Sequence, residues 1–133
     1  AGGGESVGLN IKLREWQKIN EFVKKSIGFD HLFVRKVMFS FAAPIYIFFP
    51  GGYGTLDEFF EMIMLVQTKE VRRQVLVVTV GKDYWKPLFS WLEKEVYKKR
   101  RAINKNDLKI FHLVDSAKEA FELIKRHNLS NQS

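Results

Sequence analysis

The stretch IYIFFPGGYGTLDE, residues 45–58, decides the fold of this 133-residue chain. Ile45 to Phe49 are five apolar or aromatic residues, a length typical of a strand buried on both faces. Leu56 to Val66 contains no glycine or proline, which favours a helix. Three glycines within four residues join the two elements, and Thr55 can cap the helix. The stretch therefore predicts a strand, a tight turn and a helix in direct succession.

The glycine-rich turn, residues 50–55, also has the composition of an anion-binding site. Glycine lets other atoms approach the backbone closely. A helix N-terminus offers unpaired N–H groups at the positive end of its dipole. We therefore expect a phosphate or a carboxylate to bind here. An ordinary tight turn with helix capping is the alternative, although three glycines exceed what a cap requires.

Strands and helices are expected to alternate along the rest of the chain. The predicted strands cover residues 6–13, 29–34, 74–80 and 109–114. The predicted helices cover residues 35–43, 83–99 and 117–126, while 14–25 fits either a helix or a loop. Asp115 and Ser116 cap the last helix, with Glu119 in capping-box position. This alternation predicts one α/β domain over residues 1–133, a Rossmann-like parallel sheet flanked by helices.

Composition and charge limit the partners and the compartment. The formal charge is +7, to which the run Lys98–Arg101 contributes four positive charges. We interpret this run as a solvated helix end rather than a nucleic-acid site, because the aromatic residues are not interleaved with it. No apolar run is long enough to span a bilayer, and there is no cysteine for disulfides or thiolate metal sites. We expect a cytoplasmic protein that binds neither membranes nor nucleic acid.

Carboxylates beside the glycine-rich turn are the candidates for chemistry. Asp57 and Glu58 are expected in the first helical turn, where a carboxylate can also simply compensate the dipole. Glu61 follows about one turn later. A carboxylate next to a bound phosphate can activate water or stabilise a cationic transition state. The three histidines lack metal-ligand spacing, and neither a GxSxG elbow nor a P-loop lysine is present.

Several of these motifs resemble those of the Lonely guy (LOG) family. Residues 50–58 match its PGGxGTxxE signature, and Arg35-Lys36-Val37-Met38 is similar to its RK-containing motif. Residues 6–11 resemble the SxGLNI strand of its longer bacterial branch, and Gln67 falls where that branch tends to have glutamine. The resemblance covers about Gly3 to Lys125. Members of this family are nucleoside 5′-monophosphate phosphoribohydrolases that were long described as lysine decarboxylases.

The resemblance implies a reaction and assigns residues to it. Water cleaves the N-glycosidic bond of AMP or a cytokinin ribotide, giving the free base and ribose 5-monophosphate. The 5′-phosphate would be held by Gly51, Gly52, Gly54 and Thr55. Glu58 would be the catalytic carboxylate, and Arg35 the catalytic cation near the glycosidic bond. Lys36, Met38 and Asp57 are further candidates for substrate contact.

The resemblance also implies an assembly and a missing segment. Family members carry further strand–helix units before the SxGLNI strand, so this chain is expected to lack them. They are homodimers or larger, and the apolar content of residues 37–41 and 59–62 independently predicts a subunit interface. No cofactor or metal is implied. The alternative function is a nucleotide- or molybdenum-cofactor-binding module of the same wider fold, without hydrolysis.

Overall fold

The computed structural model describes residues 3–11, 23–29, 43–71 and 74–130. The chain divides into two compact units, residues 1–42 and residues 43–133. The predicted helix over 35–43 lies almost entirely outside the described residues, as do the site candidates Arg35, Lys36 and Met38.

The described part of the first unit is a pair of parallel strands. β1 (Val7–Ile11) runs beside β2 (Lys25–Phe29), with Val7 opposite Lys25 and Ile11 opposite Phe29. β1 confirms the strand predicted over residues 6–13. The strand predicted over residues 29–34 lies outside the described residues except for Phe29, which is the last residue of β2. Gly28 lies inside β2, opposite Asn10.

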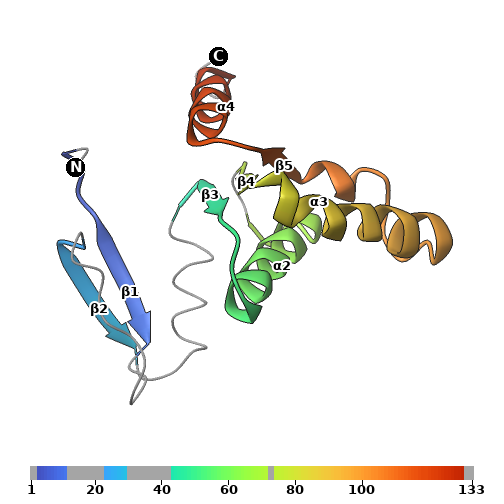
Figure 1. The fold of residues 1–133 in the computed structure, drawn as a ribbon, viewed down its shortest axis with the longest axis horizontal. Helices are drawn as coiled ribbons and strands as arrows, with labels where there is room; N and C mark the ends of the chain where they lie inside the picture. The colour runs from blue at the N-terminus through green and yellow to red at the C-terminus, as the bar shows by residue number, and fades with distance from the viewer. Residues whose placement is uncertain (1–2, 12–22, 30–42, 72–73, 131–133) are drawn as a thin grey trace. The chain divides into compact units, whose positions relative to one another are not determined.

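The second unit contains a three-stranded parallel sheet in the order β3-β4-β5 (Figure 1). The strands are β3 (Ile45–Phe48), β4 (Leu76–Val80) and β5 (Phe111–Val114). The helices are α2 (Tyr53–Gln67), α3 (Lys82–Trp91) with its π-helical continuation Leu92–Lys99, and α4 (Ala117–Ser130), besides a short 3₁₀ turn at Asp107–Lys109. These elements confirm the predicted α/β class with parallel sheets flanked by helices.

The sheet of the second unit is covered on both faces. β4 is central and buried along its whole length. Phe59 of α2 and Trp85 of α3 pack with Phe48 and Val77 on one face, and Ala120 of α4 packs on the other. The Phe59 ring lies 5.0 Å from Trp85 and 5.5 Å from Phe48, centre to centre. An aromatic core therefore lies between this face of the sheet and the helices α2 and α3.

One helix and one strand depart from the expected details. α3 begins at Lys82, one residue before the predicted start, and Pro87 lies inside it. β3 was expected to be buried on both faces, yet Ile47 is 42% exposed. Within the described sheet β3 is an edge strand, which explains its partial exposure.

The capping box predicted for α4 is present in a modified form. The Glu119 N–H donates to Ser116 Oγ at 3.2 Å, as expected for an N-cap. The Glu119 carboxylate accepts a hydrogen bond from the Asp115 N–H, one residue before the cap. Both bonds satisfy backbone donors at the helix start. No helix in the described part of the chain is both long and apolar enough to cross a bilayer.

Candidate functional site

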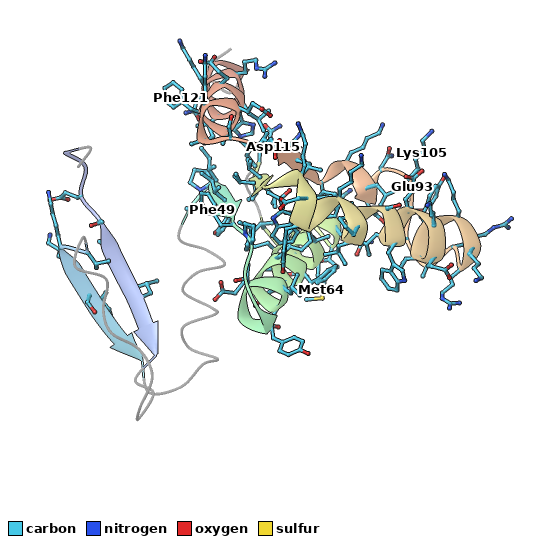
Figure 2. The ribbon with its side chains drawn as sticks, in the orientation of Figure 1. Phe49, Met64, Glu93, Lys105, Asp115 and Phe121 are labelled. Atoms are coloured by element: carbon cyan, nitrogen blue, oxygen red, sulfur yellow. The ribbon has the colours of Figure 1, made fainter. Side chains whose placement is uncertain are left out.

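Three loops follow the strands of the second unit at one edge of the sheet. Parallel strands have their carboxyl ends at the same edge, and that edge is where such sheets bind ligands. These are the glycine-rich turn after β3, Gly81 with the first residues of α3 (82–84) after β4, and Asp115-Ser116 after β5. The Lys82 N–H donates to Asp115 Oδ1 at 3.1 Å, which joins the second loop to the third. Asp115 is labelled beside the sheet in Figure 2.

Among the described residues, no side chain caps the start of α2. Its N-cap is Gly52, with extended backbone angles (φ −97°, ψ −157°), and the Leu56 N–H makes the first helical bond, to Gly52 O at 3.1 Å. The prediction that Thr55 caps this helix is therefore wrong. Asp57 and Glu58 also fall outside the first turn, because the helix begins three residues earlier than the sequence suggested. No cap bond from the described side chains satisfies the first N–H groups of α2, which makes them candidate donors to a ligand.

The three glycines of the turn differ in what surrounds them. A Cβ at Gly51 would collide with the Thr55 side chain, so packing favours glycine there. A Cβ at Gly52 or Gly54 would meet no described atom within 4 Å. Gly52 has a negative φ, so any residue can adopt its backbone conformation. Neither packing nor backbone strain accounts for glycine at positions 52 and 54, and both leave space at the helix start.

The candidate carboxylates lie along α2 beyond this space. Glu58 and Glu61 are half-buried, whereas Asp57 is exposed. Glu58 follows Gly54 by four residues and Glu61 follows Glu58 by three, so the three positions share one flank of the helix. Glu58 lies about 6 Å beyond Gly54 along the helix axis, at 1.5 Å of rise per residue. The structure thus brings Gly51, Gly52, Gly54, Thr55 and Glu58 to one end of α2.

Two residues that follow β4, Gly81 and Tyr84, contact the glycine-rich turn, and the sequence had not indicated either contact. The Tyr84 hydroxyl donates a hydrogen bond to Gly51 O at 2.8 Å. Gly81 has a φ of 102°, and a Cβ there would lie 3.3 Å from Pro50 Cγ. The signal in the sequence was Gly81 directly after an apolar strand, since consecutive parallel strands bring their following loops together.

The basic run at the end of the π-helix has partners on its own element. Lys98 Nζ lies 2.6 Å from Glu93 Oε1, and Lys99 Nζ lies 3.1 Å from Glu95 Oε2. The hydrogen bond and charge of Lys98 hold the pKa of Glu93 below its ordinary value. These pairs agree with a solvated helix end, the interpretation that the sequence favoured. Figure 2 shows Glu93 on this outer segment, away from the α2 start.

The residues that the structure describes form no candidate metal centre. No cluster of three or more histidine, aspartate or glutamate side chains there could hold a metal ion. Partial burial lowers the pKa of His112, and the charge of nearby His127 lowers it further.

Comparison with models of protein families shows which family the chain belongs to. The family model described as "Possible lysine decarboxylase" matches residues 1–124, which includes the glycine-rich turn and all of its neighbouring loops. No curated protein matches the chain.

Proposed function

Because the chain belongs to the possible lysine decarboxylase family, we propose that it is a LOG-type phosphoribohydrolase, which hydrolyses nucleoside 5′-monophosphates. In this reaction the bond between C1′ of the ribose and the base nitrogen breaks. A C1′–oxygen bond forms from water, and a proton of that water goes to the departing base. The products are the free base and ribose 5-monophosphate.

The single observation that carries the proposal is the open, uncapped start of α2. Gly52 and Gly54 are not required by the packing of the described residues, and they border N–H groups that no described side chain caps. A helix start of this kind suits a phosphate group, which needs several N–H donors and close approach to the backbone. Thr55 Oγ1, which lies over Gly51, is a further donor at the same position.

Glu58 suits the role of the catalytic carboxylate. A nucleotide with its phosphate at the start of α2 can extend its ribose along the flank that carries Gly54 and Glu58. A carboxylate there orients the attacking water or stabilises the oxocarbenium-like transition state. Arg35, which the motif resemblance assigns to the glycosidic bond, is part of the proposal through that resemblance.

Decarboxylation of lysine, the activity in the family description, fits this chain poorly. It requires pyridoxal phosphate on a lysine whose amine is desolvated enough to form a Schiff base. Every lysine that the structure describes is exposed. The described residues therefore do not suit that cofactor, and we derive no step through it.

Incubation of the protein with AMP tests the proposal. We expect adenine and ribose 5-monophosphate in equal amounts, separated by chromatography. Glu58→Gln should reduce their release about a hundredfold or more, whereas Glu122→Gln, which removes an exposed carboxylate from α4, should not. Binding of AMP without any adenine release would overturn hydrolysis and favour the alternative, a nucleotide- or cofactor-binding module.

A further inference from the structure

The backbone of the glycine-rich turn is held from outside by the helix that follows β4. The Tyr84 hydroxyl, in the first turn of α3, donates to the Gly51 carbonyl at 2.8 Å. Tyr84 itself is half-buried, and its ring packs edge-on against Trp85, with centres 5.0 Å apart. Trp85 is fully buried in the core. The hydroxyl that reaches Gly51 is therefore fixed to the rigid part of the unit.

The direction of the Gly51 carbonyl determines the direction of the next N–H group. A peptide unit is planar and trans, so the C=O of Gly51 and the N–H of Gly52 point in opposite directions. With the carbonyl directed at Tyr84, the Gly52 N–H is directed away from α3. The opposite orientation of this peptide would present a carbonyl oxygen where the N–H now lies.

That opposite orientation is sterically accessible because the peptide joins two glycines. Glycine populates regions of φ and ψ that other residues avoid, so a Gly–Gly peptide can rotate at little cost. An exposed carbonyl oxygen at an anion site repels phosphate, while an N–H donates to it. A turn built for close approach to the backbone thus needs a contact that fixes its orientation.

We propose that Tyr84 is a positioning residue for the phosphate site: its hydrogen bond to Gly51 fixes the Gly51–Gly52 peptide with the N–H toward the ligand. This inference rests on the proposed function for the identity of the anion. Gly81 supports the same contact, because its lack of a side chain lets Pro50 lie against the loop after β4. Tyr84 touches the turn and not the reacting atoms, so its effect is on binding of the phosphate end.

The test compares Tyr84→Phe with Tyr97→Phe, which removes a phenol hydroxyl from the π-helix, outside the turn. Calorimetry measures the affinities for AMP and for adenosine, which lacks the phosphate. We expect Tyr84→Phe to bind AMP about tenfold more weakly, because the Gly52 N–H is no longer held toward the phosphate and one hydrogen bond to a charged group is lost. The affinity for adenosine should be unchanged. Tyr97→Phe should match the wild type for both ligands. Unchanged AMP affinity in Tyr84→Phe would overturn the inference.

A second measurement needs no ligand. ¹⁵N relaxation reports the order parameter of the Gly52 amide, and we expect it to fall from about 0.85 toward 0.6 in Tyr84→Phe. The same order in both proteins would show that Tyr84 does not hold the peptide. A wild type that binds AMP no better than adenosine would overturn the phosphate site and the proposed function together, and the Gly52 order parameter would still decide whether Tyr84 fixes the peptide.

Discussion

Replacing Gly54 by alanine separates what the fold needs from what a ligand needs. Gly54 is the second residue of α2, where alanine is the better helix former and meets no described atom. We expect Gly54→Ala to raise the free energy of unfolding by about 0.5 kcal/mol while weakening AMP binding at least tenfold. Urea unfolding and calorimetry on the same sample measure both. Unchanged affinity would show that no ligand approaches this position.

Gly51→Ala should have the opposite effect on stability. Its Cβ would collide with Thr55 Oγ1, so either the threonine or the turn must shift. We expect a loss of about 1–3 kcal/mol in the free energy of unfolding, typical of overpacking. Gly52→Ala is the matched control, because its Cβ meets no described atom and its φ is unstrained. Equal losses in the two variants would contradict the different roles assigned to these glycines.

Glu58→Gln distinguishes a catalytic carboxylate from an ordinary helix residue. If Glu58 acts on the transition state, AMP binding should remain nearly intact while turnover falls about a hundredfold or more. Arg35→Lys should also reduce turnover, because lysine cannot reproduce the guanidinium fork. The double variant should be little worse than the worse single one if the two residues act as a unit. Near-normal adenine release by Glu58→Gln would remove it from the mechanism.

His112 should make stability fall on acidification. Its pKa in the folded protein lies below the ordinary value of about 6.5, so just below that pH the unfolded chain binds more protons than the folded one. The free energy of unfolding should therefore decrease as the pH falls through about 6.5, and this contribution should level off below the folded pKa. Urea unfolding at pH 7.5 and pH 5.5 measures the change, which His112→Gln should reduce. An equal change in both proteins would assign the effect to other groups.

At the scale of elements, the sequence predicts the strands formed by long apolar runs better than it predicts where the helices begin. β3, β4 and β5 lie within a residue or two of their predicted positions, because a run such as residues 76–80 has few alternatives to a buried strand. The start of α2 was misplaced because Thr55 is a good capping residue by type, whereas the helix begins at Tyr53. The Thr55 side chain lies against Gly51 and does not cap the helix, and this depends on the path of the backbone through the turn.

Residues of the candidate site could be identified from the sequence where they lie close together in the chain. Gly51, Gly52, Gly54, Thr55 and Glu58 are close in sequence, so one motif brings them together. Tyr84 is 33 positions from Gly51, and its contact depends on the parallel pairing of β3 with β4. Local patterns do not specify such contacts between loops, although the rule that strand ends meet at one edge indicates where to search.

For the whole molecule, the structure changes where a subunit interface is expected. The apolar residues 59–62 suggested one, but Phe59 and Met62 are buried in the unit's own core. Phe60 of that stretch remains on the outer face of α2 together with two other residues: Tyr53, Phe60 and Met64 are 93%, 39% and 54% exposed, and Figure 2 shows Met64 projecting outward. Their spacing of seven and four residues puts them on one face of the helix. An apolar face of this kind is characteristic of interaction sites.

We therefore expect a homodimer or larger assembly that uses this face of α2, as the family resemblance also implies. Light scattering at micromolar concentration should give at least twice the chain mass for the wild type. Met64→Asp should shift it toward the monomer, because a buried unpaired carboxylate is costly at an interface. Phe121→Asp, at a position on α4 that is 63% exposed, is the control and should leave the mass unchanged. If the interface positions the substrate, the rate of adenine release by Met64→Asp should fall together with the mass of its assembly. Both should recover together as the protein concentration is raised. A wild-type mass of one chain would contradict the assembly, and a monomeric Met64→Asp with full activity would show that the site at the start of α2 is complete within one chain.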